Sequence, residues 1–386
     1  MRIAIFTETF LPSTDGIVTR LCATLQHLQR DGHDVLLFAP AGGPATYASA
    51  QVIDLPSFRF FLYPDKRFAL PRRRVAKPLQ DWSPDLVHVL NPAFLGIAGL
   101  YYARRFGIPI LASYHTNVPV YAHHYRLDWL EPVLWWYFRT LHNQANMNLC
   151  TSQAMVKELT AHNFHNVGLW DRGVDTQVFG SAQPSAHLHE TWTQGDTAGK
   201  ILLYVGRLAA EKQIQRLRVV VDANPHIHLV IVGDGPYRGD LERVFAGTHT
   251  RFIGYLHGSA LAQAYATADG FVFPSTTETL GLVLYEAMAA GLPILAADSP
   301  PTREVLEEGE AGIIYSGRDS DVLLRSVHEL LYDEPRRAGL RKRGRQIAEA
   351  MDWSGPTRQL VEYYQSVIQE GMQTVSTGAQ RGSRIS

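Results

Sequence analysis

The sequence is poor in cysteine, nearly neutral, and free of long apolar runs. It contains only two cysteines, Cys22 and Cys150, without metal-ligand spacing, which predicts a reducing compartment and no disulfide. The net charge of −1 gives no support for nucleic-acid binding. No apolar run reaches the roughly 20 residues that a membrane-spanning helix needs, and Glu8 interrupts any secretory signal at once. We therefore expect a cytoplasmic protein whose contact with a membrane is at most peripheral.

Short apolar segments alternate with helical patterns along the whole chain, which predicts parallel sheets covered by helices on both faces. Strands are expected at 2–7, 34–39, 86–90, 109–113, 147–150, 167–170, 201–205, 227–232, 250–253, 270–273 and 293–297. Because 386 residues exceed what one core usually holds, the expected fold class is α/β, with two facing doubly wound Rossmann-like domains. Such domains bind ligands at the carboxyl ends of their strands, here in an interdomain cleft.

A polar stretch without periodicity predicts the domain boundary. We expect an N-terminal domain at 1–179, a linker at 180–199 and a C-terminal domain at 200–352. A helix at 355–369 is expected to pack back on the first domain, followed by a disordered tail at 371–386.

Residues 274–293 carry the most informative pattern, in which Glu278 and Glu286 flank the start of an apolar helix. The N–H groups around Thr279, Leu280 and Gly281 are placed to bind a phosphate, because N–H groups at a helix start lack intrahelical partners and the helix dipole is positive there. The carboxylates could accept hydrogen bonds from sugar hydroxyls. This predicts a nucleotide-sugar site; the alternative is an ordinary capped helix with solvent-facing glutamates.

Arg207 and Lys212 follow a predicted strand and could neutralise the charge on a departing diphosphate. The alternative for Arg207 is a surface ion pair with Glu211. Gly16 lies between a strand and a helix, where its missing Cβ would let backbone approach a phosphate, or where it is only a turn glycine.

His115 follows another strand, where it could bind a sugar hydroxyl or hold charge near a reaction centre. The alternative is a structural histidine. The pair Asp319 and Asp321 reads as a helix N-cap rather than a metal site, so we expect no metal in the chemistry. Arg238 breaks the dinucleotide fingerprint that begins at Gly233.

Two segments of the first half suggest a membrane-facing surface. Residues 126–141 are rich in tryptophan and other aromatic residues, and residues 66–77 hold six basic residues and only apolar or proline residues otherwise. Aromatic side chains suit a membrane interface, and a basic cluster attracts anionic lipid headgroups. The alternatives are a buried core helix and a solvated charged face.

Taken together, the motifs resemble those of retaining GT-B glycosyltransferases over nearly the whole chain. The residues that carry this resemblance are Asp15-Gly16, Gly206-Arg207…Glu211-Lys212, Val232-Gly-Asp-Gly-Pro236 and Glu278-x7-Glu286. A narrower set is similar to the sulfolipid synthases of cyanobacteria and chloroplasts: Phe6-Thr-Glu-Thr-Phe-Leu-Pro12, Ser113-Tyr-His-Thr116, Leu169-Trp-Asp-Arg-Gly-Val-Asp175 and Ser275-x-Thr-Glu-Thr-Leu-Gly281.

This resemblance implies transfer of sulfoquinovose from UDP-sulfoquinovose to diacylglycerol at an anionic membrane, on its cytoplasmic or thylakoid face. No cofactor is implied, because the UDP-sugar is a substrate. The resemblance implies these roles: Glu286 for the ribose, Glu278 and the N–H groups after it for the sugar, Arg207 and Lys212 for the diphosphate, His115 for the reaction centre, Gly16 and Gly233 for close approach to the substrate, and Tyr255-Leu256 for uracil.

A sulfonate needs a cation, for which Arg172 is the first candidate and Arg20 the second; either could be a structural ion pair instead. Three alternatives stay open for the function. One is a UDP- or GDP-hexose-dependent lipid glucosyl- or mannosyltransferase. The others are a GT-B-shaped sugar-nucleotide epimerase and a nucleotide-sugar-binding protein without catalysis.

Overall fold

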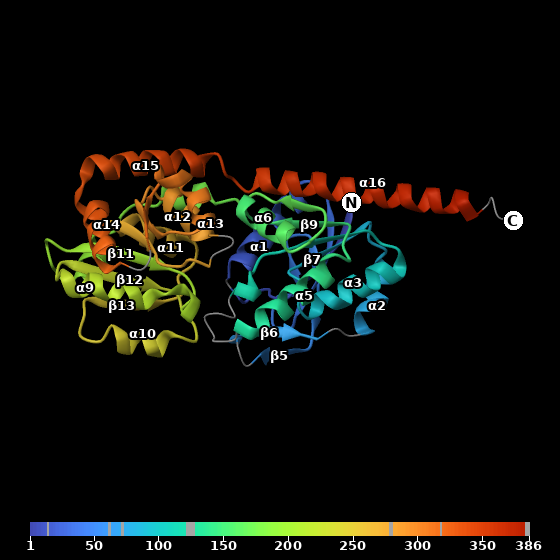
Figure 1. The fold of residues 1–386 in the computed structure, drawn as a ribbon, viewed down its shortest axis with the longest axis horizontal. Coiled ribbons are helices and arrows are strands. Elements are labelled where there is room, and N and C mark those ends of the chain that lie inside the picture. Colours follow the sequence, from blue (N-terminus) through green and yellow to red (C-terminus); the bar gives the residue numbers. More distant parts are fainter. Residues whose placement is uncertain are drawn as a thin grey trace. The chain divides into compact units, whose positions relative to one another are not determined.

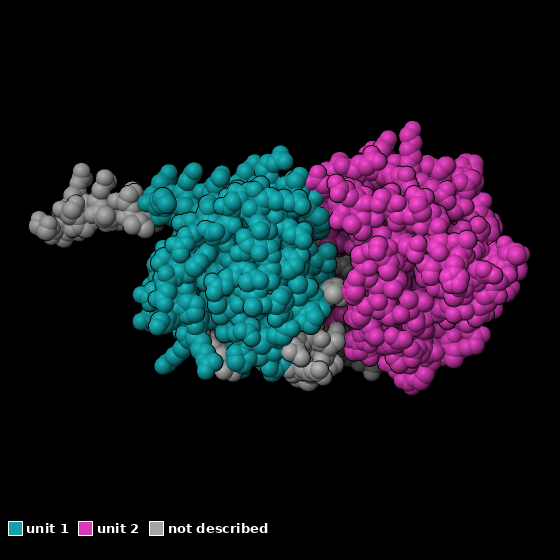
Figure 2. Space-filling model, turned by 180° about the vertical axis from the view of Figure 1, so that it is seen from behind, with its two compact units in different colours: residues 1–122, 127–171, 353–386 teal, residues 123–126, 172–352 magenta. Residues whose placement is uncertain are grey.

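In the computed structural model, the chain divides into two compact units. The structure describes residues 1–13, 15–60, 63–70, 73–120, 128–277, 281–316 and 319–382. Unit 1 contains residues 1–122, 127–171 and 353–386, and unit 2 contains residues 123–126 and 172–352 (Figure 2). The last segment of the chain therefore belongs to the same unit as the first.

The core of unit 1 is a sheet to which eight strands of the described residues contribute (Figure 1). Its order is β10-β9-β8-β7-β1-β2-β4-β3, and its pairs are parallel except for β3 with β4. The strands are β1 Arg2–Thr7, β2 Asp34–Pro40, β3 Thr46–Tyr47, β4 Ala50–Leu55, β7 Leu86–Leu90, β8 Ile110–Ser113, β9 Met147–Cys150 and β10 Val167–Leu169. A separate hairpin joins β5, Ser57–Phe60, to β6, Tyr63–Ala69.

Helices cover both faces of this sheet. Helices α1 and α16 pack on one face, where Leu25 and Leu360 join Ile5 in one cluster, and α3 packs on the other face, where Leu100 joins Phe6. The helices of unit 1 are α1 Gly16–Arg30, α2 Ala76–Trp82, α3 Leu95–Phe106, α5 Glu131–His142, α6 Gln153–Ala161 and α16 Ser354–Gly382. Two apolar faces explain why the central strands are continuous hydrophobic runs.

Unit 2 repeats the architecture with a parallel sheet of six strands among the described residues, in the order β13-β12-β11-β14-β15-β16. The strands are β11 Lys200–Val205, β12 Ile227–Val232, β13 Thr250–Gly254, β14 Gly270–Phe273, β15 Ile294–Ala297 and β16 Ile313–Tyr315. Successive side chains of a strand point to opposite faces, so Leu203 joins one core cluster while Leu202 and Tyr204 join the other.

The helices of unit 2 flank these two clusters (Figure 1). They are α7 Thr176–Ser181, α8 Ala186–Thr193, α9 Arg218–Ala223, α10 Arg238–Val244, α11 Gly258–Thr267, α12 Leu282–Ala289, α13 Pro300–Val305, α14 Ser320–Tyr332 and α15 Glu334–Glu349. The order of the strands changes direction between β11 and β14, which are neighbours in the sheet but far apart in the chain. Ligands of doubly wound sheets bind at such switch points.

The structure differs from the expected linker at 180–199 and from the expected domain end at 179. The boundary falls between Asp171 and Arg172, and half of the expected linker is helix α8 with its capping residues. Trp192 of α8 is buried, and the Ser185 N–H donates to Thr267 Oγ1 over 3.0 Å. The polar composition concealed a helix that is held by packing on unit 2.

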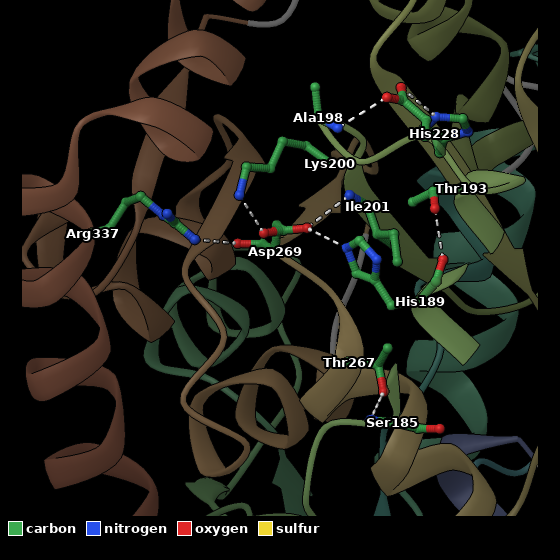
Figure 3. Close-up of polar contacts among 11 residues, drawn as sticks. Ser185, His189, Thr193, Ala198, Lys200, Ile201, His228, Thr267, Asp269 and Arg337 are labelled. Atoms are coloured by element: carbon green, nitrogen blue, oxygen red, sulfur yellow. Dashed lines mark hydrogen bonds and ion pairs between the residues drawn. The ribbon is translucent and has the colours of Figure 1, made fainter. Parts of the chain in front are cut away.

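Asp269 ties the start of β11 to its surroundings beside that helix (Figure 3). Its carboxylate accepts hydrogen bonds from Lys200 Nζ and from the Ile201 N–H, each over 2.9 Å, and its backbone oxygen accepts one from Arg337 over 3.2 Å. The amino end of the sheet is therefore fixed by charged contacts, while the candidate site lies at the carboxyl ends.

The C-terminal segment also differs from expectation. Helix α16 continues through the expected tail as far as Gly382, and residues 383–386 lie outside the described part. Its buried residues Leu360, Tyr364 and Val367 pack in the core of unit 1. Among the described residues, no helix is long and apolar enough to cross a membrane.

Candidate active site

His115 lies just beyond the end of β8 in unit 1. Its backbone N–H and that of Thr116 donate to Asn91 Oδ1, over 3.2 and 3.3 Å, and its Nε2 lies 2.9 Å from Ser113 Oγ. The side chain is buried, and its ring meets Trp170 edge to face. Burial, and next the nearby Arg20 charge, hold the pKa of His115 well below its usual value. His115 is therefore a neutral hydrogen-bonding group.

Gly16 is the first residue of α1, and Asp15 caps this helix. Asp15 Oδ1 accepts from the N–H groups of Ile17 and Val18, each over 3.1 Å. A carboxylate thus already accepts from two of the N–H groups at the start of this helix. Close approach of a phosphate at Gly16 stays a prediction.

Glu8 is a buried carboxylate that directly follows strand β1. Its oxygens accept from four N–H groups at the start of α3, those of Ala93, Phe94, Leu95 and Gly96, over 2.8–3.1 Å. Burial raises the pKa of Glu8, although these hydrogen bonds favour its ionised form. Its partners make it a cap for α3, a role that was not foreseen from the sequence.

Arg207 follows β11 in unit 2 and forms an ion pair with Glu211, the partner that the sequence offered as an alternative. Glu211 is fully buried, whereas the Arg207 side chain keeps 17% of its surface exposed. The 3₁₀ turn that contains Lys212 ends at Gln213, whose Nε2 donates to Thr276 Oγ1 over 3.0 Å. This contact joins the loop after β11 to the loop after β14.

Gly233 and Gly235 allow the loop after β12 to approach the loop after β11. Gly233 has φ +130°, and a Cβ there would lie 2.0 Å from the Gly206 oxygen; at Gly235 a Cβ would lie 2.4 Å from the Leu208 oxygen. No side chain fits at either position without moving backbone. These glycines bring the loops together, which explains them without a dinucleotide fingerprint.

The loop after β13 joins this group at Tyr255. The Tyr255 hydroxyl donates to the Asp234 oxygen over 3.2 Å, and the side chain is 52% exposed. Leu256 packs against the core. An exposed ring at this strand end suits the predicted contact with uracil, which stays a prediction.

Glu286 is half-buried in α12, where its Oε2 accepts from the Tyr265 hydroxyl over 2.8 Å. Burial raises the pKa of Glu286 to about 7, and the Tyr265 hydrogen bond opposes that rise. Gly281, immediately before α12, has φ +59°, a left-handed conformation that suits glycine. Glu278, Thr279 and Leu280 lie outside the described residues, so their predicted contacts stay predictions.

Arg172 is buried at the start of unit 2, and its Nη1 donates to the Tyr285 hydroxyl over 3.1 Å. Tyr285 precedes Glu286 in α12, so the partner of Arg172 and the predicted ribose ligand are consecutive residues of one helix. Arg20 in unit 1 stacks on Trp170 with 3.4 Å between its Cζ and the ring centroid, and donates to backbone oxygens. These partners favour a structural role for Arg20.

Among the described residues, no group of three or more His, Cys, Asp or Glu side chains could hold a metal ion. Asp319 caps α14 by accepting from the N–H groups of Asp321 and Val322, as the sequence predicts.

Comparisons with known proteins agree with this architecture. Residues 14–178 match the family described as Glycosyltransferase Family 4, and residues 193–347 match Glycosyl transferases group 1. Sucrose-phosphate synthase from Thermosynechococcus elongatus has a similar solved structure, with a TM-score of 0.76 at 20% identity, covering 96% of this chain and 99% of that one. Anabaena HepE in complex with UDP-glucose gives a TM-score of 0.76 at 18% identity, covering 95% of this chain and 100% of that one.

Two similar curated proteins extend over most of the chain. Sulfoquinovosyl transferase SQD2 of Arabidopsis thaliana is 33% identical over 380 residues, which cover 95% of this chain and 74% of that protein. A GDP-mannose-dependent alpha-mannosyltransferase of Mycolicibacterium smegmatis is 34% identical over 374 residues, which cover 95% of this chain and 98% of that protein.

The fold, with its clustered strand-end loops, defines a GT-B glycosyltransferase. Within that class, the chain belongs to glycosyltransferase family 4, with a group 1 glycosyltransferase module in its second half. The predicted fold class and the prediction of a glycosyltransferase are confirmed. The sulfoquinovosyl transferase and the mannosyltransferase are similarly close to this chain.

Proposed function

We propose that this chain transfers sulfoquinovose from UDP-sulfoquinovose to diacylglycerol and forms sulfoquinovosyldiacylglycerol. The observation that carries the proposal is the 33% identity to a sulfoquinovosyl transferase over 95% of the chain, together with the motifs around His115, Arg172 and Ser275. Buried Arg172, whose guanidinium reaches the Tyr285 hydroxyl, supplies a fixed cation that suits a permanent sulfonate anion.

Unit 2 would hold the donor. Arg207 and Lys212 face the diphosphate in this proposal, Glu286 accepts hydrogen bonds from the ribose, and Tyr255-Leu256 contacts uracil. The contacts between the loops after β11, β12, β13 and β14 support it, because they gather these residues at one edge of one sheet. The donor sugar would lie at Glu278 and the N–H groups of residues 279–281.

The transfer would proceed with retention and without a metal ion. Two basic side chains and a helix start can balance the charge on the departing UDP. The leaving phosphate oxygen would then take the acceptor proton on the face from which it departs. His115, which is buried and neutral, would line the reaction centre as a hydrogen-bonding group.

Unit 1 would bind the acceptor and the membrane surface. Trp129 and Trp136 are 72% and 57% exposed, whereas Trp135 and Phe138 of the same aromatic run are buried in the core. Arg73 and Arg74 are exposed in the basic run. Exposed tryptophans and arginines suit an anionic lipid surface, which supports a peripheral location on the cytoplasmic or thylakoid face.

A second candidate is mannosyl transfer from GDP-mannose. The Mycolicibacterium smegmatis mannosyltransferase favours it, because this chain covers 98% of that protein at 34% identity. Glucosyl transfer to diacylglycerol is related to it: the alpha-monoglucosyldiacylglycerol synthase of Streptococcus pneumoniae is 30% identical over 338 residues. The sugar-nucleotide epimerase is a weaker alternative. Such an enzyme needs no lipid, so it would not account for the exposed tryptophans and arginines of unit 1.

The test is incubation with UDP-sulfoquinovose, UDP-glucose or GDP-mannose, each with and without diacylglycerol vesicles and each with and without excess chelator. Lipid products are read by mass spectrometry and their anomeric configuration by NMR. Of the three donors, we expect only UDP-sulfoquinovose to yield a lipid product, an α-linked sulfolipid. Its yield should not change with chelator, and UDP should be released only when lipid is present. A hexolipid from GDP-mannose would select the second candidate, and sugar interconversion without lipid would select the epimerase.

A further inference from the structure

A chain of hydrogen bonds runs from the C-terminal helix α16 to His115 through the core of unit 1. The Tyr364 hydroxyl lies 2.6 Å from His88 Nδ1. His88 Nε2 lies 2.9 Å from Ser113 Oγ, and Ser113 Oγ lies 2.9 Å from His115 Nε2. All four side chains are at most 3% exposed. Such buried networks are strong because little water competes with them.

The fold dictates this alignment. His88 lies on β7 between Val87 and Val89, which join the cluster beneath α3. Because side chains alternate along a strand, His88 points to the opposite face, beneath α1 and α16. The pairing of β7 with β8 sets Leu90 opposite Ser113, so Ser113 lies on that same face.

The direction of the hydrogen bonds follows from the donors available. Within the described residues, the Tyr364 hydroxyl has one hydrogen bond, to His88, and it is fully buried. If Tyr364 donates to His88 Nδ1, then His88 Nε2–H donates to Ser113, and the Ser113 hydroxyl donates to His115 Nε2. The reverse direction would leave the buried Tyr364 O–H without an acceptor, which costs roughly 5- to 150-fold in relative population.

We propose that Tyr364 is a positioning residue that, through His88 and Ser113, sets the tautomer of His115 and keeps its proton on Nδ1. His115 then presents a hydrogen-bond donor at Nδ1 to whatever oxygen it meets there. Its contribution to the reaction rests on the proposed function, in which His115 lines the reaction centre. A residue of the last helix thereby controls the chemistry of a residue in the first half of the chain.

The charges around the network keep it neutral. Burial lowers the pKa of His88 to about 3, and Arg20 adds to this effect. The ring of Trp170 lies 5.6 Å from His115 and 5.7 Å from His88, centroid to centroid. A neutral histidine carries one ring proton, so one ring nitrogen can donate and the other can accept. The hydrogen bonds of the network therefore run in one direction, and the network carries no positive charge.

The test is ¹⁵N NMR of full-length protein labelled at histidine, since ring nitrogens with and without a proton differ widely in chemical shift. Loss of signals in His115→Gln assigns the residue. In the wild type we expect protonated Nδ1 and unprotonated Nε2. In Tyr364→Phe, which keeps the ring and removes the O–H, the preference should weaken at least about fivefold and move both shifts toward intermediate values.

Tyr363→Phe is the matched control, because Tyr363 on the same helix donates its hydroxyl to the Leu169 oxygen over 3.0 Å, outside the network. It should leave the His115 shifts unchanged. Ser113→Ala should also disturb them, and Ser113→Thr, which keeps a hydroxyl, should restore them. A proton on Nε2 in the wild type, or unchanged shifts in Tyr364→Phe, would overturn the proposal.

Kinetics separates this proposal from the proposed function. We expect Tyr364→Phe to lower kcat severalfold with little change in KM for the donor, and Tyr363→Phe to match the wild type. A changed tautomer with unchanged kcat would support the relay and contradict the placement of His115 at the reaction centre.

Discussion

The two units share one architecture, but their candidate site residues differ in charge. Beside His115 in unit 1, the polar side chains form a neutral network, and the buried histidines have pKa values far below the usual range. In unit 2, the loop after β11 carries the ion pair of Arg207 with Glu211, and helix α12 carries Glu286, whose pKa burial raises to about 7. The difference suits the proposed division of labour, in which unit 2 would hold the charged nucleotide and unit 1 would supply uncharged hydrogen bonds.

The largest effect that would sharpen this comparison is expected from removal of the unit 2 cations. Arg207→Ala and Lys212→Ala should each lower kcat by about 10²–10³-fold and raise KM for the donor less, because the charge on the diphosphate grows as the bond breaks. Steady-state kinetics of the transfer measures both constants.

Arg207→Ala also strips a buried carboxylate of its partner, so its stability must be checked by thermal unfolding. Arg218→Ala is the matched control, since Arg218 forms an i,i+4 ion pair with Asp222 away from the site. Wild-type turnover in both site variants would show that the diphosphate binds elsewhere.

Glu286 should make the stability of unit 2 depend on pH. Its pKa is raised from 4.5 to about 7, so the folded state keeps a proton that the unfolded state loses in between. The sign follows: wild-type stability falls as pH rises from 4.5 to 7. Glu286→Gln has no carboxyl group to titrate, so its free energy of unfolding should not fall in this way. The difference in free energy of unfolding between the variant and the wild type should therefore shift in favour of the variant by about 3 kcal/mol between pH 4.5 and 7. Urea unfolding at pH 4.5 and 8 measures it. An exposed control, Glu349→Gln, should show a constant difference, and a constant difference in Glu286→Gln would contradict the burial argument.

The proposed membrane face of unit 1 should depend on surface charge. Arg73 and Arg74 are exposed, and Arg72 lies outside the described residues. Changing all three to Ala should weaken binding to anionic vesicles by about 1 kcal/mol per arginine near the surface at low salt. The loss should shrink with added salt, because salt screens the attraction. Sedimentation with vesicles measures it. Arg104→Ala with Arg105→Ala, on α3, serves as the charge control; unchanged binding in the triple variant would count against this face.

The smallest effect concerns the choice of sugar. Arg172→Met should reduce kcat/KM for UDP-sulfoquinovose about tenfold or more relative to UDP-glucose, because a charge-assisted hydrogen bond to the sulfonate is lost. Tyr285→Phe removes the hydroxyl that Arg172 contacts and tests whether that contact positions the guanidinium. Equal losses with both donors would make Arg172 a structural residue.

The sequence predicts the central strands well because buried parallel strands are apolar runs, and the observed β12, Ile227–Val232, coincides with its predicted range. It misses α8, whose residues look like a polar linker and are ordered by packing on unit 2. It also misses β4 and the β5–β6 hairpin, which lack the long apolar pattern of the central strands.

For the site, the sequence indicates Arg207 and Lys212 because they follow a strand, and Glu286 because it lies near the start of an apolar helix. All three belong to motifs that are local in the chain. It does not indicate the network of His88 and Tyr364, residues that lie 276 positions apart. Their contact depends on strand register and on the return of α16 to unit 1, and neither can be read from a local pattern. The sequence does offer one hint of the network, because His88 is a polar residue within the apolar strand β7.

The dependence of kcat/KM for the donor on pH tests the contrast between the units most directly, since this ratio reports ionisations of the free enzyme. In the proposed function Glu286 binds the ribose, and its ionised form would accept these hydrogen bonds better than the protonated form, so kcat/KM should rise through a pH of about 7. The rise should vanish in Glu286→Gln and persist in His115→Gln. A rise that persists in Glu286→Gln and vanishes in His115→Gln would place the titrating group in unit 1 and contradict this account.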